Sequence, residues 1–123
     1  MPVFLPPTVA THPNERLESW AVFQVSLPGL SGPTLHVVGH VDDGTGRVSS
    51  PLVNIDEAAR SVVTRSGRVY RLVGRPGLGG SGEYVWNRWV AGWSARDVTD
   101  VTAEFALRFN KARGDSHGSE RGS

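Results

Sequence analysis

Arginine side chains gather in one stretch of the chain and form its clearest chemical feature. Between Glu57 and Glu83 the sequence has no acidic residue, yet it carries five arginines, which are Arg60, Arg65, Arg68, Arg71 and Arg75. The planar guanidinium donates paired hydrogen bonds to phosphate or carboxylate oxygens. Because the formal net charge of the whole chain is only +1, these side chains predict a local positive field on a nearly neutral protein.

Two of these arginines flank a predicted β-hairpin turn. Ser66-Gly67 fits a two-residue loop, because Gly67 tolerates the positive φ that such loops require. With that loop Arg65 lies opposite Arg68, and Val63 lies opposite Tyr70. Two arginines beside a tyrosine predict a contact with an anion, a nucleic acid or a partner. The alternative is that both arginines extend into water and discourage pairing between sheet edges.

Aromatic residues are concentrated further along the chain. When residues 83–91 are interpreted as a strand, Tyr84 and Trp86 lie on one face, whereas Trp89 and Trp93 lie on the other. One set would fill the core and the other would form a recognition surface, although aromatic residues on both faces are also ordinary in a small sheet covered by a helix. The candidate partner-binding residues are therefore Arg65, Arg68, Tyr70, Arg71 and Trp89.

Motifs for catalysis, metal binding or cofactor binding are weak in this sequence. The glycine-rich segment 74–82 lacks the Gly-Lys-Ser/Thr of a phosphate loop, and the strand predicted after it leaves no helix to receive a phosphate or a dinucleotide. His36 and His40 would lie ~13 Å apart on a strand, too far for one metal ion. The chain has no cysteine, no nucleophile elbow and only scattered carboxylates, so we predict no enzyme, no metal site and no cofactor.

The elements that must position these residues are mostly strands. Short β-branched and aromatic runs between Gly, Pro and Asp turns predict strands at 20–27, 35–41, 47–55, 60–65, 68–73 and 83–91. The spacing of Val98, Val101, Phe105 and Phe109 after Asp97 predicts one amphipathic helix at about 98–112. We expect a mainly β fold (α+β): an antiparallel meander of about six strands, as a curved sheet or small open barrel, with one C-terminal helix.

Length and composition predict a single small domain. The chain has 123 residues, of which 38% are apolar and 20% charged, values typical of globular proteins. Four prolines predict an extended arm over residues 1–18, followed by the β-rich domain at 19–112 and a disordered tail at 113–123. No apolar run approaches the ~18–20 residues of a membrane helix, and no secretory signal is visible, so we expect a cytoplasmic protein without membrane contact.

Three short segments stand out as motifs: Arg47-Val-Ser-Ser50, Thr64-Arg-Ser-Gly-Arg-Val-Tyr70 and Tyr84-Val-Trp-Asn-Arg-Trp89. With these motifs, about a third of the chain resembles short uncharacterised proteins of high-GC bacteria and their phages or plasmids. The resemblance implies no named activity and no catalytic residues. It implies a mobile-element setting, in which small binding proteins block a host or competitor system, as anti-CRISPR proteins do.

These observations together favour a small non-enzymatic binding protein that occupies a surface of a protein or protein complex, as an anti-defence inhibitor would. A mimic of nucleic acid would be strongly acidic, which the charge of +1 argues against. One alternative is a nucleic-acid-binding module that uses the same arginine and aromatic residues, although the pI of 8.3 lies below the value of about 9 typical of such modules. Another is a structural or small-ligand-binding homo-oligomer whose edge strands pair between subunits.

Overall fold

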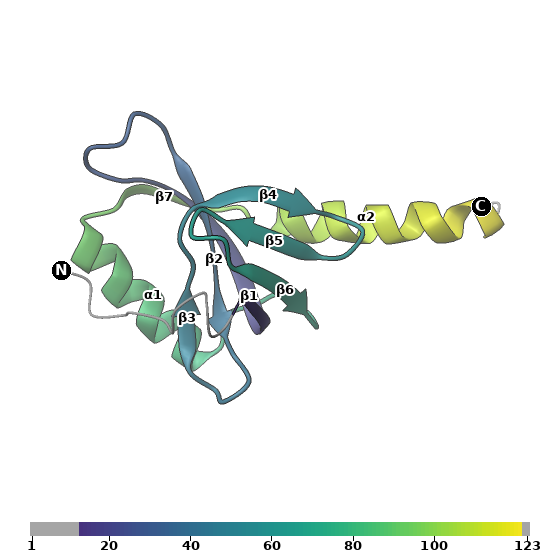
Figure 1. The fold of residues 1–123 in the computed structure, drawn as a ribbon, viewed down its shortest axis with the longest axis horizontal. Helices are drawn as coiled ribbons and strands as arrows, with labels where there is room; N and C mark the ends of the chain where they lie inside the picture. The colour runs from purple at the N-terminus through teal and green to yellow at the C-terminus, as the bar shows by residue number, and fades with distance from the viewer. Residues whose placement is uncertain (1–12, 122–123) are drawn as a thin grey trace.

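The fold is a mixed β-sheet of seven strands that does not close into a barrel, accompanied by two helices (Figure 1). The structure is a computed structural model that describes residues 13–121, with the side chains of residues 13–112. In chain order the elements are β1 (Asn14–Ser26), β2 (Thr34–His40), β3 (Gly46–Val48), β4 (Leu52–Asp56), β5 (Ser61–Thr64), β6 (Val69–Val73), α1 (Gly80–Trp93), β7 (Arg96–Asp100) and α2 (Thr102–Arg121).

Strand β1 is the centre of the sheet and pairs with three other strands. The strand order is β3-β2-β1-β6-β5-β4, and β7 also pairs with β1. Along one edge β1 is antiparallel to β2, while on the other edge its first half is parallel to β6 and its last residues are antiparallel to β7. The predicted antiparallel meander is therefore wrong, because β1 pairs in parallel with a strand far away in the sequence.

The first part of β1 falls in the segment expected to be a loose N-terminal arm. Residues 1–12 lie outside the described residues, and Asn14–Glu18 form hydrogen-bonded pairs with β6. The pairing with β2 shifts register just after Glu18, where Ser19 has a φ of 47°. This β-bulge turns the strand, so that Leu17 and Trp20 both enter the same core.

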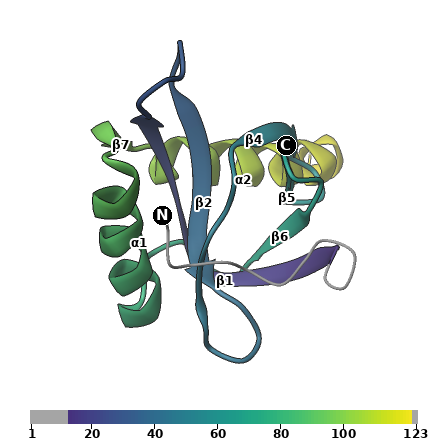
Figure 2. The same cartoon turned by 60° about the vertical axis from the view of Figure 1, so that its left-hand side comes forward.

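Two separate hydrophobic cores lie under the two helices, which occupy different sides of the sheet (Figure 2). In one core Phe105 and Phe109 of α2 pack beside β1, with the Phe109 ring edge-on to Trp20 at 5.8 Å. In the other, Trp86 and Trp89 of α1 pack on valines of β1, β2 and β3. The start of α1 approaches β3 so closely that a side chain at Gly46 would collide with the backbone.

Helix α1 replaces the strand predicted at residues 83–91. On a helix Val85, Trp86 and Trp89 share one buried face, while Tyr84 is 60% exposed. The predicted alternation of the tryptophans between two faces is therefore wrong. The segment has the β-branched and aromatic residues typical of strands, but burial of one helical face against the sheet decides its structure.

The remaining elements follow the sequence more closely. Strand β2 and its following turn lie where predicted, and Pro51 divides the predicted strand 47–55 into β3 and β4. Residues Arg96–Asp100 form β7, so the predicted C-terminal helix begins later, at Thr102, whose backbone N–H donates to the Asp100 carboxylate at 2.9 Å. Helix α2 continues to Arg121 and so includes residues 113–121, which were expected to be disordered. Within the described chain neither helix has the length and apolar character needed to cross a membrane.

Candidate binding site

A pocket of about 440 Å³ lies between the β5–β6 hairpin, the loop after β1 and the last turns of α1. The loop after β1 supplies Leu27, Pro28 and Leu30, and α1 supplies Trp89 and Trp93. Strands β2 and β3 and the connection to β4 supply the floor. The residues there and on the hairpin are His36, Val48, Ser49, Ser50, Pro51, Thr64, Arg65, Ser66, Arg68 and Tyr70.

The hairpin turn has three loop residues rather than the predicted two. The Thr64 N–H donates to the Arg68 carbonyl at 2.9 Å, and the Gly67 N–H donates to the Thr64 carbonyl at 2.8 Å. Gly67 has a φ of 95°, as a three-residue loop of this kind requires. Arg65 therefore does not oppose Arg68, and Tyr70 pairs with Val62 instead of Val63.

The side chains of the hairpin differ in their accessibility. Arg68 and Tyr70 are each 2% exposed, so neither lies on the outer surface of the hairpin as predicted. Arg65 is exposed at the tip, and its guanidinium has no ion pair with a described residue. Its backbone N–H donates to the Pro51 carbonyl at 2.7 Å, which ties the tip to the connection between β3 and β4.

Four of the five predicted partner-binding residues meet at this pocket: Arg65, Arg68, Tyr70 and Trp89. Arg71 does not, because successive side chains on a strand point to opposite faces. It lines a separate, larger hollow of about 920 Å³ beside β1 and β6. The structure thus brings four of the five predicted residues to one pocket and places Arg71 at another.

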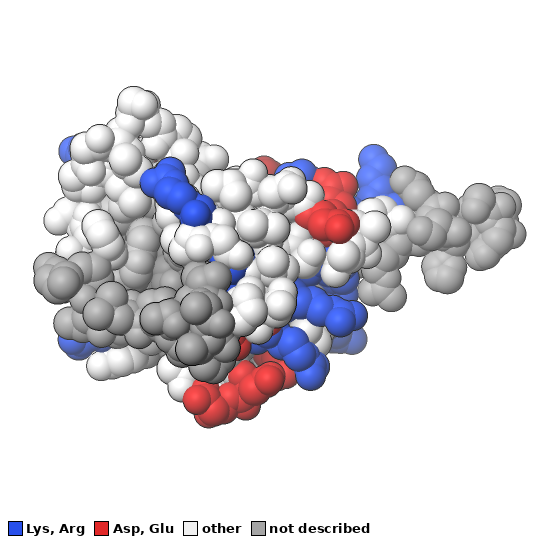
Figure 3. Space-filling model, in the orientation of Figure 1, with Lys and Arg blue, Asp and Glu red and all other residues white. Residues whose placement is uncertain are grey.

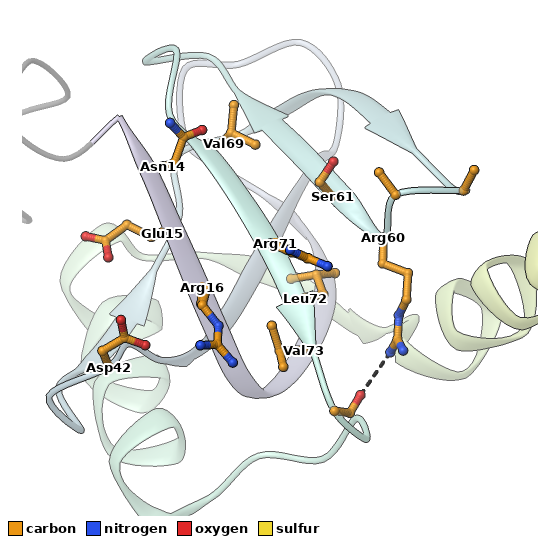
Figure 4. A pocket seen from close by; sticks show the side chains of 13 residues that line it. Asn14, Glu15, Arg16, Asp42, Arg60, Ser61, Val69, Arg71, Leu72 and Val73 are labelled. Atoms are coloured by element: carbon orange, nitrogen blue, oxygen red, sulfur yellow. Dashed lines mark hydrogen bonds between the residues drawn. The ribbon is translucent and has the colours of Figure 1, made fainter.

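The larger hollow combines both signs of charge. Arg16 and Arg71 are register neighbours on β1 and β6, and Asp42 and Glu15 also line the hollow. Basic side chains gather beside the end of β6, with acidic ones near the β2–β3 loop (Figure 3). In the close view, Arg16 and Arg71 point in different directions rather than toward one common point (Figure 4). We therefore take the smaller pocket as the candidate site.

A row of aromatic rings forms one wall of the pocket. Phe23 stacks on Trp86 at 4.4 Å, Trp86 stacks on Trp89 at 5.2 Å, and the Trp89 and Trp93 centroids are 6.2 Å apart. The row runs from the core to the pocket mouth, where Trp93 is 42% and Leu30 43% exposed. Stacking on Trp86 holds Trp89 in place. Trp93 and Leu30 present apolar surface that a ligand could bury.

His36 forms part of the pocket floor and is held as a neutral ring. Its Nδ1 lies 2.8 Å from the Ser49 carbonyl, an acceptor, so Nδ1 carries the proton. Its Nε2 lies 2.8 Å from the Thr34 hydroxyl, which then donates to it. Burial lowers the pKa of His36, and the positive charge of Arg65 adds to this effect, while the hydrogen bond to Ser49 opposes it. With both nitrogens engaged, His36 is not poised as a base or a metal ligand.

The pocket combines cationic and hydroxyl groups with apolar walls. Among the described residues, its lining includes Arg65 and Arg68 but no Asp or Glu. Its hydroxyls bond to one another, since Ser66 Oγ lies 3.0 Å from Thr64 Oγ1 and 3.2 Å from Ser50 Oγ. No three His, Asp or Glu side chains in the described part of the chain are grouped to hold a metal ion. The arrangement offers apolar walls under a positive charge.

Sequence reasoning missed the residues that make the mouth of this pocket. Trp93 lies four residues after Trp89, and on α1 their ring centroids are 6.2 Å apart, whereas the strand interpretation puts both on one face but ~13 Å apart along the strand. Leu30 lies in a Gly- and Pro-containing loop, where no periodic pattern marks a functional residue. Comparison of the chain with models of known protein families, with curated proteins and with solved structures gives no match.

Proposed function

We propose that this protein is a small non-enzymatic binding protein that acts by occupying a surface of a protein complex. The pocket between the hairpin tip and α1 is the contact, and the observation that carries the proposal is its open apolar mouth. Trp93 and Leu30 expose large apolar side chains beside Trp89, which is buried and held by its stacking on Trp86. Large, rigid aromatic groups next to a pocket are the anchors on which protein interfaces most depend.

The burial of the hairpin favours a protein partner over nucleic acid. A nucleic-acid interface needs exposed cations along the backbone and accessible rings for stacking. Arg68 and Tyr70 are buried, and Arg71 lies in the other hollow, so of the predicted arginines only Arg65 is exposed at this pocket. One accessible arginine beside apolar walls fits a protein surface better than a run of phosphates.

The proposed setting is the cytoplasm of a bacterium, where the protein would serve a phage or another mobile element as an accessory or anti-defence inhibitor. The resemblance of three of its segments to proteins of such elements supports this setting. Blocking a complex requires only a surface that competes for a site, so an anti-CRISPR-like role needs no catalytic group.

A pull-down from host lysate, with and without nuclease, tests the proposal. The Trp93→Ala variant should lose a nuclease-resistant protein partner, which wild type should then rebind in purified form. Tyr84→Ala is the matched control, because Tyr84 is an exposed aromatic residue of α1 outside the pocket. Nucleic acid that disappears on nuclease treatment, or a partner retained equally by Trp93→Ala, would overturn the proposal.

A further inference from the structure

The charge of the pocket is unbalanced in a way that specifies its occupant. We propose that it accepts an aromatic or branched aliphatic side chain of the partner that stands next to a carboxylate. The inference rests on the proposed function, since it names the chemistry of the segment bound at that site. It follows from two features of the lining. Trp89, Trp93, Leu27 and Leu30 contribute apolar walls, and the described residues that line the pocket include cationic groups but no acidic residue.

Arg65 is the group that would receive the carboxylate. It is exposed at the tip of the hairpin, and no described residue forms an ion pair with it. A guanidinium in this state can donate two parallel hydrogen bonds to an incoming carboxylate without first breaking an internal pair. Arg65 lines the same pocket as the buried ring of His36, whose pKa its positive charge helps to lower.

The backbone that carries Arg65 is held in place by hydrogen bonds before any ligand arrives. Besides the Arg65 bond to Pro51, the Ser66 N–H donates to Ser50 Oγ at 3.3 Å, and Gly67 closes the turn. The backbone of the tip is thus bonded on both sides of the loop. An arginine carried by a fixed backbone loses less conformational entropy on binding than one carried by a mobile loop.

The size and openness of the pocket fit a single anchoring residue. Its volume of about 440 Å³ lies in the lower part of the 300–1,000 Å³ range of small-ligand sites. Trp93 and Leu30 stand at the mouth, where they can cover the apolar part of the occupant. The occupant's carboxylate would then stay at the rim near Arg65, where its desolvation costs least.

Two small probes that differ only in charge test this assignment directly. N-acetyl-phenylalanine carries a carboxylate at pH 7, whereas N-acetyl-phenylalaninamide has the same aromatic body and no charge. Neither probe absorbs at the excitation wavelength of tryptophan, so Trp89 and Trp93 report binding by fluorescence. We expect the carboxylate probe to bind roughly threefold to fivefold more tightly at low salt, the range of a partly exposed ion pair.

Variants of Arg65 separate the charge from the shape of the pocket. Arg65→Ala should abolish the preference for the carboxylate, and Arg65→Glu should reverse it. Arg71→Ala should leave the preference unchanged, because Arg71 lines the other hollow. Arg65 is an exposed turn residue whose side chain forms no ion pair with the part of the chain that the structure describes, so these variants should keep the wild-type circular dichroism spectrum.

The possible outcomes distinguish this inference from the proposed function. Equal binding of the two probes, or a preference that survives Arg65→Glu, would overturn the inference even if Trp93→Ala still lost its partner. Displacement of a captured partner by the carboxylate probe supports it, and failure to displace the partner at a saturating concentration of the probe overturns it. A clear preference for the carboxylate, with no protein captured through Trp93, would instead overturn the proposed function.

Discussion

Arg47 is a cation held inside the protein, and its replacement should destabilise the fold strongly. Its Nη1 donates to Glu15 Oε2 and to the Tyr70 hydroxyl, both at 3.3 Å. The side chains of Arg47 and Glu15 are only 8% and 12% exposed. Arg47→Met would leave the Glu15 carboxylate without this partner in a site with little access to water.

The expected size of the effect follows from this burial. Removing one member of a fully buried ion pair costs about 3–5 kcal/mol. Since both side chains keep slight contact with water, we expect about 3 kcal/mol for Arg47→Met and somewhat less for Glu15→Gln, which leaves Arg47 bonded to Tyr70. The double variant should be more stable than the two single effects predict, by at least about 1.5 kcal/mol, because it leaves no unpaired charge.

Urea unfolding followed by tryptophan fluorescence measures these differences. With a denaturant slope of about 1–3 kcal/mol per molar, the midpoint for Arg47→Met should fall by roughly 1–3 M. Arg71→Met is the matched control, because Arg71 is exposed and should change stability by less than about 0.5 kcal/mol. A loss below about 1 kcal/mol for Arg47→Met, or strictly additive effects in the double variant, would refute the reasoning.

Two further predictions concern the pH dependence of stability and the close contact between β3 and the start of α1. The folded-state pKa of His36 lies below its ordinary value of 6.5, so on acidification the unfolded chain takes up a proton at this residue before the folded protein does. The free energy of unfolding should therefore fall as pH drops below about 6.5, by at most ~1.4 kcal/mol per pH unit. Urea unfolding measured between pH 7 and 5 should show a weaker dependence of stability on pH for His36→Gln than for wild type; an equal dependence in the two proteins would contradict this account. Gly46→Ala should cost about 1–3 kcal/mol, because its Cβ would collide with the Ser81 carbonyl. Gly92→Ala in α1, with open space around it, should stabilise the fold by about 0.5–1 kcal/mol. The melting temperature should therefore fall for Gly46→Ala and rise for Gly92→Ala, and a change in the same direction for both variants would refute the steric argument.

Local signals in the sequence predict the strands and turns whose partners lie nearby. The run Leu35–Val41 and the turn after it are visible because alternation and glycine spacing act over a few residues. Pairing between distant segments leaves no such trace, so the parallel contact of β1 with β6 and the place of β7 could not be predicted. Residues 83–91 show the same limit, since strand-forming residues adopt a helix when that buries Trp86 and Trp89 together.

The candidate site was predictable in composition more than in geometry. Arginine and aromatic residues mark the region, and four of the five predicted residues meet there. A single extra loop residue shifts β5 by one position against β6. Thr64 and Val62, rather than Arg65 and Val63, therefore share the buried face with Arg68 and Tyr70, because side chains alternate along a strand with a period of two. Sequence spacing alone could not decide between two and three loop residues, since Gly67 suits either turn.

The triple pairing of β1 also affects how the chain can fold while it is being made. One edge of β1 receives β2 soon after synthesis, but the other edge must wait for β6 and β7. At ~5–20 residues per second, a ribosome needs roughly 4–15 s to pass from Ser26 to Asp100. Throughout that time part of the central strand has unpaired backbone groups that could pair with another nascent chain. High expression of this protein should therefore favour aggregation during translation over unfolding of the finished fold.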